Sequence, residues 1–294
     1  MHKELSKFIN DNLPLIDEKL HTVLDGVNLS KTLKESMAYS INAGGKRIRP
    51  LLVLATLKDL QADSKDALAV AGAIELIHTY SLIHDDLPSM DDDDYRRGKL
   101  TNHKVFGEAV AVLAGDALQA LAFQMLSELK ETNPADALRL MHLLGTASGA
   151  AGMVGGQMLD LEGEQKKLSL SELEQIHIHK TGALLSFCIE AGAILAGLES
   201  EKAENLKEYA YHIGLAFQIQ DDILDVTATT EQLGKTAGSD TASEKSTYPA
   251  LLGLDGAQER LMAHHQSAKE ALAFLEVETS LLALFADYIV ERQS

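Results

Sequence analysis

Residues 68–91 read LAVAGAIELIHTYSLIHDDLPSMD. Apolar side chains recur in this segment every three or four residues, which is the spacing of one face of an α-helix. The same period runs through most of the chain, and the alternation typical of a strand is hard to find. The sequence therefore predicts an all-α fold.

The predicted helices follow each other along the whole chain without a linker or a shift in composition. Proline and glycine place their ends only approximately. We expect one domain over 1–294, with long polar loops at 91–103 and 226–240 that either fold over a bound ligand as lids or serve as plain connections. The predicted helices are 3–24, 31–42, 47–60, 65–87, 105–130, 135–161, 171–197, 202–225, 242–253, 256–270 and 275–291.

Composition limits the kind of partner that this chain meets. Its 294 residues include 26 Lys and Arg against 44 Asp and Glu, a formal net charge of −18. Such a balance argues against nucleic acid or an anionic membrane surface as the partner. The apolar content of 46% is typical of a globular protein that buries a sizeable core.

The remaining global signals favour the cytoplasm. Cys188 is the only cysteine and lies in an apolar stretch, so we expect a core residue in a reducing compartment. The first residues mix charges and lack the apolar run of a secretory signal. Acids such as Glu75 and Asp116 interrupt the long apolar runs, and we expect no membrane-spanning segment.

Two clusters of acids, each at the end of an apolar helical stretch, carry the strongest functional signal. They are Asp85-Asp86-Leu87-Pro88-Ser89-Met90-Asp91 and Asp221-Asp222-Ile223-Leu224-Asp225. Carboxylates this dense repel one another unless a cation shares them, and hard oxygen ligands suit magnesium. Magnesium commonly bridges carboxylates to phosphates, so a phosphorylated ligand is the natural partner.

Local geometry supports a shared metal in each cluster. Asp221 and Asp225 lie one helical turn apart on one face, whereas Asp222 points off it. Pro88 ends the first helix, and the turn after it lets Asp91 come back toward Asp85. An isolated acid run is more often a solvated face, but here apolar sequence precedes each cluster.

Basic residues stand close to both clusters. Arg96 and Arg97 follow the first cluster and Lys235 follows the second, and such cations neutralise a diphosphate. A third basic element, GGKRIRP at residues 44–50, combines glycines with three cations ahead of a helix. It lacks the glycine spacing and the hydroxyl of a Walker loop, so nucleotide hydrolysis is disfavoured.

Taken in order from about residue 40 to 250, these motifs resemble the trans-isoprenyl diphosphate synthases. The resemblance rests on residues 44–50, on the first acid cluster with Arg96-Arg97-Gly98, on Phe217-Gln218 before the second cluster, and on Gly234-Lys235 after it. It implies a helical bundle around a deep central cavity, usually a homodimer. Such enzymes join an allylic diphosphate to isopentenyl diphosphate, with no nucleic acid and no stable membrane insertion.

Carried over position by position, the resemblance assigns roles to individual residues. It implies three magnesium ions when substrate is bound. The metal ligands are Asp85, Asp91 and Asp221, helped by Asp86 and Asp225, and the catalytic set adds Asp222, Lys180 and Thr181. The allylic diphosphate meets Arg96, Lys180, Thr181, Gln218 and Lys235. The isopentenyl diphosphate meets Lys46, Arg49, His78 and Arg97.

Tyr80 and Ser81 are the candidates for limiting product length. At 1.5 Å rise per residue, Tyr80 lies about 7.5 Å below the metal-binding end of its helix, where its ring could form a floor. This aromatic, with the insertion Pro88-Ser89, is similar to the bacterial type of farnesyl diphosphate synthase. The resemblance implies a C15 product, (2E,6E)-farnesyl diphosphate, with a C20 product as the main alternative and C10 behind it. The plain alternative for Tyr80 is a core tyrosine with a bonded hydroxyl.

Other classes explain less of the chain. A di-iron bundle would use the Glu-x-x-His spacings of Glu75 to His78 and Glu174 to His177, but it leaves both acid clusters unexplained. A terpene cyclase normally has one aspartate-rich motif, whereas this chain has two. A regulatory subunit of a two-chain prenyl synthase typically loses one motif, and both are intact here.

Overall fold

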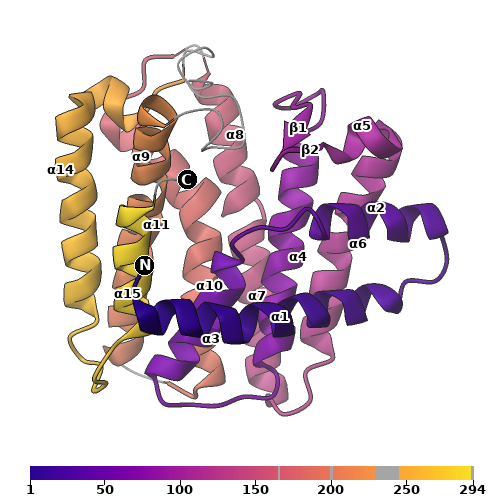
Figure 1. Cartoon of the computed structure of the whole chain (residues 1–294), viewed down its shortest axis with the longest axis horizontal. Helices are drawn as coiled ribbons and strands as arrows, with labels where there is room; N and C mark the ends of the chain where they lie inside the picture. Colours follow the sequence, from indigo (N-terminus) through magenta and orange to yellow (C-terminus); the bar gives the residue numbers. More distant parts are fainter. Residues whose placement is uncertain (165, 199–200, 229–244, 293–294) are drawn as a thin grey trace.

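A computed structural model describes residues 1–164, 166–198, 201–228 and 245–292, and these residues confirm the all-α fold. Figure 1 shows a bundle in which most helix axes are roughly aligned, while α1 lies across them. The helices are α1 (Lys3–Asp25), α2 (Lys31–Ile41), α3 (Ile48–Asp59), α4 (Ala67–Asp85), α5 (Asn102–Phe106), α6 (Glu108–Ser127), α7 (Pro134–Ser148), α8 (Met153–Gly163), α9 (Leu170–His177), the π-helical η1 (Ile178–Gly182), α10 (Ala183–Leu195), α11 (Glu201–Thr227), α14 (Tyr248–Ala271) and α15 (Leu281–Glu291).

Glycines divide two of the predicted helices. The helix expected at 135–161 is broken between Ser148 and Met153, where Gly149 and Gly152 have non-helical backbone angles. The helix expected at 105–130 begins earlier and divides into α5 and α6 at Gly107, whose φ is 86°. A positive φ of this kind costs glycine little, which explains the position of the break.

Two further differences lie near the acid clusters. The loop expected at 91–103 contains a short antiparallel hairpin, β1 (Tyr95–Arg96) with β2 (Lys99–Leu100). The two helices expected at 242–253 and 256–270 form one element, α14, which has non-helical angles at Gly253. The predicted stop near residue 253 is therefore a kink.

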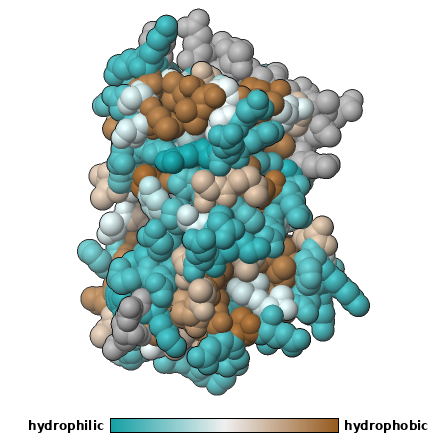
Figure 2. All heavy atoms as spheres, turned by 90° about the vertical axis from the view of Figure 1, so that its left-hand side faces the viewer, coloured by the Kyte–Doolittle hydropathy of each residue, from teal (hydrophilic) through white to brown (hydrophobic). Residues whose placement is uncertain are grey.

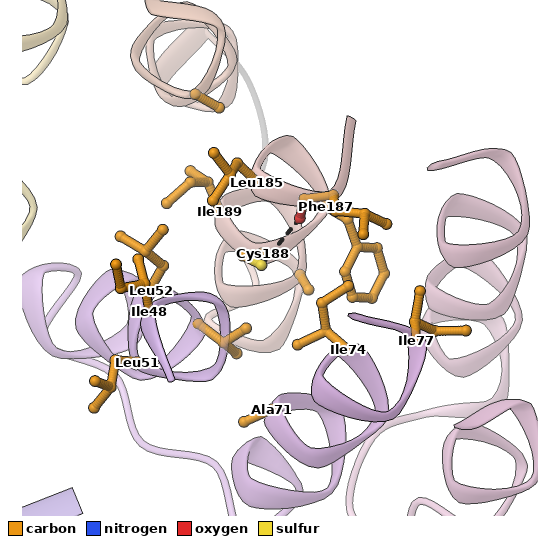
Figure 3. Packing of buried hydrophobic residues seen from close by; sticks show 14 of the residues in the cluster. Ile48, Leu51, Leu52, Ala71, Ile74, Ile77, Leu185, Phe187, Cys188 and Ile189 are labelled. Carbon is orange, nitrogen blue, oxygen red and sulfur yellow. Dashed lines mark hydrogen bonds between the residues drawn. The ribbon is translucent and has the colours of Figure 1, made fainter. Parts of the chain in front are cut away.

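The core is centred on α4, which packs against α3, α6 and α10. Figure 3 shows side chains of α3, α4 and α10 meeting around Cys188. The Cys188 thiol is fully buried and donates to the Leu184 carbonyl at 3.0 Å. The expectation of a core cysteine is therefore confirmed, and burial raises the pKa of this thiol.

Three helices are apolar enough to span a membrane by length and composition alone: Ala67–Asp85, Glu108–Ser127 and Leu170–Leu195. The expectation that charged residues interrupt every such run was wrong, because each of these helices contains a window of 18 residues with at most two charged side chains. Most of Ala67–Asp85 and of Leu170–Leu195 is buried inside the protein, whereas only 39% of the α6 segment is. Many apolar residues of α6 therefore lie outside the core of this chain.

Figure 2 looks at the side of the molecule where α14 lies. This face is largely hydrophilic, and a patch of hydrophobic residues lies near its upper end. Exposed leucines occur at the start of α14: Leu251, Leu252 and Leu254.

Candidate active site

The first acid cluster folds back on the end of α4 as predicted. The Asp91 backbone N–H donates to the Asp85 carbonyl at 2.9 Å, so the turn after Pro88 brings Asp91 beside Asp85. Burial raises the pKa of Asp85 to about 6, with Asp91 and Asp86 adding to the shift and Lys180 opposing it. A cation close to Asp85 and Asp91 would therefore stabilise the ionised form of Asp85.

Asp86 has a different environment from Asp85. Its carboxylate is buried and accepts from Arg96, with Nε 2.6 Å and Nη2 2.5 Å from Oδ1. This ion pair fixes Arg96 of β1 against the end of α4. Burial raises the pKa of Asp86, and the charge of Arg96 opposes this shift. The contacts of Asp86 therefore hold the Arg96 guanidinium in place.

The second acid cluster lies in the last turns of α11. Asp221 accepts from Arg292 Nη2 at 2.7 Å. Asp222 is buried and accepts from Gln218 at 3.1 Å and from the Tyr248 backbone N–H at 3.0 Å, which ties the start of α14 to α11. Asp225 is buried on the same helix. Lys235, expected beyond this cluster, lies outside the described residues.

Lys180 and Thr181 lie in η1, a π-helical turn between α9 and α10. Such turns are rare and frequent at functional sites. Lys180 Nζ donates to Asp160 of α8 at 2.6 Å, and Thr181 donates to Gln218 of α11 at 3.0 Å. Burial tends to raise the pKa of Asp160, but Lys180 outweighs it and the pKa is lowered. Three residues that we assigned to the allylic diphosphate, Lys180, Thr181 and Gln218, thus lie together.

Close packing by glycine holds η1 in place on two sides. A Cβ at Gly156 of α8 would lie 2.1 Å from the Lys180 backbone nitrogen. A Cβ at Gly214 of α11 would lie 3.0 Å from Gly182 Cα. Both distances are too short for a larger residue, so these glycines let two helices approach the turn that carries Lys180.

The basic residues assigned to isopentenyl diphosphate also come together. Arg49 Nη1 lies 3.3 Å from His78 Nε2, and the Arg97 guanidinium donates to the Gly44 carbonyl. Burial, followed by Arg49 and Arg97, holds the pKa of His78 well below its usual value, so this imidazole is neutral.

This basic pocket reaches the second acid cluster. Burial and then Arg292 lower the pKa of Lys46, while Asp221 opposes the shift. Burial also lowers the pKa of Arg49, and Asp221 is among the groups that oppose it. Lys180 opposes the raised pKa of Asp85, and the adjacent Thr181 donates to Gln218 of α11, so η1 lies between the two acid clusters.

The donor set fits magnesium that arrives with a diphosphate. Among residues 1–164, 166–198, 201–228 and 245–292, no three acid, histidine or cysteine side chains form a ready-made metal group. Magnesium usually takes one or two carboxylates together with water and substrate phosphate oxygens. Asp85, Asp91 and Asp221 offer hard oxygens of this kind, and the raised pKa of Asp85 shows that its charge lacks full compensation.

Tyr80 faces inward one turn before Asp85. Its side chain is buried, its ring lies 5.7 Å from that of His84, and its pKa is raised by burial to about 12. The hydroxyl is near Gln119 but makes no hydrogen bond of good geometry. The Ser81 hydroxyl, by contrast, donates to the His78 carbonyl at 2.9 Å.

Sequence reasoning missed Arg292, and it counted Arg47 among the cations of residues 44–50 without giving it a role of its own. Arg292, at the end of α15, contacts Asp221 and lies over the Phe217 ring at 4.1 Å. Arg47 is buried in an ion pair with Glu75, 2.8 Å apart. Glu75, an acid in the middle of the apolar helix α4, was a sequence signal for a buried basic partner such as Arg47. No pattern in the sequence around Arg292 indicates its role.

These ion pairs also remove the basis for a di-iron centre. Glu75 accepts from Arg47, and Glu174 accepts from Arg260 at 2.7 Å. The glutamate of each Glu-x-x-His motif is therefore already paired with an arginine and does not serve as an iron ligand.

Comparison with known proteins agrees with this geometry. The family model described as polyprenyl synthetase matches residues 30–277. The farnesyl diphosphate synthase of Geobacillus stearothermophilus is 49% identical over 290 residues, which cover 98% of both chains.

Two solved structures share the fold over nearly the whole chain. The FPP/GFPP synthase from Zymomonas mobilis is 41% identical, with a TM-score of 0.86 over 98% of this chain and 100% of that one. The geranylgeranyl pyrophosphate synthetase from Pyrococcus horikoshii is 32% identical, with a TM-score of 0.89 over 99% of both.

Proposed function

Because the chain belongs to the polyprenyl synthetase family, we propose that it is a farnesyl diphosphate synthase. It condenses isopentenyl diphosphate with dimethylallyl and then geranyl diphosphate to give (2E,6E)-farnesyl diphosphate. One observation carries this function: each of the acid clusters that end α4 and α11 has its own cations nearby, Arg96 and Lys180 at the first and Lys46 and Arg49 at the second. A metal store would need no such second basic pocket.

The first set of side chains orients the allylic diphosphate. Asp86 holds Arg96 in place, Asp160 holds Lys180, and Thr181 is bonded to Gln218. Asp85, Asp91 and Asp221 would hold magnesium, which supplies positive charge for the leaving diphosphate when bound. Arg96 and Lys180 stabilise the same developing charge by direct electrostatic attraction.

The second set places the attacking double bond. Lys46, Arg49 and Arg97 hold isopentenyl diphosphate, and His78 contacts Arg49 as a neutral group. The double bond attacks the allylic cation, and the departing diphosphate takes the proton that is then lost. No side-chain base is required, and the apolar residues of α4 keep water from the cation.

A homodimer is part of this proposal. α6 is the least buried of the three most apolar helices. Its Val112 and Leu113 are exposed, and adjacent exposed apolar side chains on a strongly apolar helix are typical of an interaction surface. A second copy of this chain accounts for such a face, and we place one 294-residue catalytic domain in each subunit, in the cytoplasm.

The test is a product assay with magnesium, isopentenyl diphosphate and either dimethylallyl or geranyl diphosphate. We expect mainly a C15 product from both allylic substrates and no turnover when EDTA removes the metal. The Pyrococcus horikoshii structure shares the fold and is named for a C20 product, so a main product of C20 would favour that alternative. Absence of any condensation would contradict the proposed function.

A further inference from the structure

Arg47 begins α3 in a backbone conformation that ordinary residues avoid. Its φ is 49° and its ψ is 35°, in the left-handed region. A non-glycine residue in such a region costs on the order of 1 kcal/mol and persists only where surrounding contacts fix it. Arg47 lies between Lys46 and Arg49, the two cations that we assigned to isopentenyl diphosphate.

The guanidinium of Arg47 contacts three separate parts of the chain. Nη1 donates to Glu75 of α4 at 2.8 Å, and Nε donates to Asp17 of α1 at 3.1 Å. Nη2 donates to the Ile41 carbonyl at 2.8 Å. The side chains of Arg47 and Glu75 are only 4% and 3% exposed, so this ion pair is almost fully removed from water.

The segment from Ile41 to Arg47 depends on these contacts for its shape. Gly44 and Gly45 both have positive φ, so the segment has no regular structure of its own. The Gly44 carbonyl accepts from the Arg97 guanidinium and, at 3.5 Å, from Arg47 Nη1. Arg47 therefore fixes the inner side of the segment that presents Lys46.

Glu75 supplies negative charge beneath the basic pocket. It lies one helical turn before His78 on α4. Burial lowers the pKa of both Arg49 and Arg97, and the negative charge of Glu75 opposes that shift. Because charges buried together need compensation, Glu75 stabilises the cluster of arginines when no diphosphate is bound.

We propose that Arg47 and Glu75 form a buried positioning pair that fixes segment 41–47 and thereby shapes the isopentenyl diphosphate pocket at Lys46 and Arg49. This inference rests on the proposed function. The pair touches neither substrate, so its effect is on affinity for one substrate and not on the chemistry.

A purely structural role predicts a different outcome when both charges are replaced together. Removing one partner of a buried pair leaves an unpaired charge, whereas replacing both by apolar residues often leaves stability intact. We therefore choose the double variant Arg47→Met/Glu75→Leu, with stability measured by urea denaturation. The binding measurement is calorimetry with isopentenyl diphosphate alone in the presence of EDTA, which does not depend on turnover.

The expected result is a variant about as stable as the wild type whose dissociation constant for isopentenyl diphosphate rises roughly tenfold. The KM for geranyl diphosphate should change less than about twofold, because that substrate uses the other set of side chains. A second variant, Arg47→Lys, keeps opposite charges near each other but lacks the forked donors. It should also weaken binding of isopentenyl diphosphate.

The matched control is Arg260→Met/Glu174→Leu. This pair is also an arginine with a glutamate three residues before a histidine, but it joins α9 to α14. It should leave the affinity for isopentenyl diphosphate unchanged. Wild-type affinity in both Arg47 variants would overturn the positioning role while leaving the proposed function intact. A wild-type protein that binds no isopentenyl diphosphate would overturn the proposed function, and this inference with it.

Discussion

Individual residues of the site work in pairs of opposite charge. Asp86 with Arg96 and Asp160 with Lys180 are such pairs, and each holds a cation that we assign to substrate. Fixing a long cationic side chain before substrate arrives reduces the entropy that binding must overcome. The acids around the site thus divide into those that face a metal and those that orient a cation.

Truncation of Tyr80 tests its assignment as the residue that limits product length. Tyr80→Ala removes a buried ring whose hydroxyl makes no hydrogen bond, so the growing chain gains room beside α4. We expect the product to shift from C15 to C20 or longer, as measured by chromatography of the dephosphorylated alcohols. Tyr211→Ala, at an exposed tyrosine, should leave the distribution unchanged. An unchanged distribution in Tyr80→Ala would reject the floor assignment alone.

Sequence alone singles out the two acid clusters and the basic motif as candidates, because their spacing along helices is local information. The partners of those residues come from elsewhere in the chain. Asp160 lies 20 residues before Lys180, and Arg292 lies 71 residues after Asp221. Only the packing of helices brings such residues together, so no local pattern could reveal them.

At the scale of elements, most helices lie within a few residues of their predicted bounds because the apolar period and the prolines are strong signals. The breaks at Gly107 and at 149–152 were missed, since a glycine within a periodic run does not by itself stop a helix. The π-turn at 178–182 was also missed. It preserves the apolar pattern around it, so periodicity does not reveal the extra residue.

Gly156 provides a test of that turn. Gly156→Ala puts a methyl group against the backbone of Lys180, and α8 and η1 must separate. Because a shift of about 1 Å at a site can cost roughly 100-fold in rate, we expect kcat to fall by about that factor. The control is Gly145→Ala on α7, where the new Cβ would lie 3.8 Å from Phe123 and needs no movement. Equal activities of the two variants would contradict the argument.

The start of α4 gives a prediction about stability and pH. Asp66 accepts from the backbone N–H groups of Lys130, Glu131 and Thr132 at 2.8 to 3.0 Å and from the Thr132 hydroxyl at 2.9 Å. Burial opposes ionisation, but these bonds outweigh it and lower the pKa of Asp66 from 3.8 to about 2.

The native pKa of Asp66 lies below the unfolded one, so its carboxylate stabilises the native state above pH 4. This contribution is lost as the pH falls through about 2. We expect Asp66→Asn to lower the free energy of unfolding by about 2 kcal/mol at pH 7 and by roughly half of that at pH 3. Urea denaturation at both pH values gives the comparison, and a deficit that grows toward low pH would contradict the sign.

For the whole molecule, the distribution of apolar surface predicts the assembly. Leu113 on α6 is 57% exposed within a group of apolar neighbours, whereas Leu29 is fully exposed near the N-terminal end of α2. Leu113→Asp should convert a dimer to a monomer, because it places a charge in a desolvated interface. Leu29→Asp should leave the mass unchanged. Light scattering measures both, and a wild type of monomer mass would contradict the proposed dimer.

The central claim is that acids from α4 and α11 close on a single metal–diphosphate complex. The most direct measurement is calorimetry of a non-reacting allylic diphosphate analogue, with and without magnesium, on Asp85→Asn, Asp221→Asn and the double variant. Groups that share one ligand are not additive. We expect each single variant to lose most of the magnesium-dependent affinity and the double variant to lose little more. Losses that add in the double variant, or a normal affinity in either single variant, would show that the two clusters act separately.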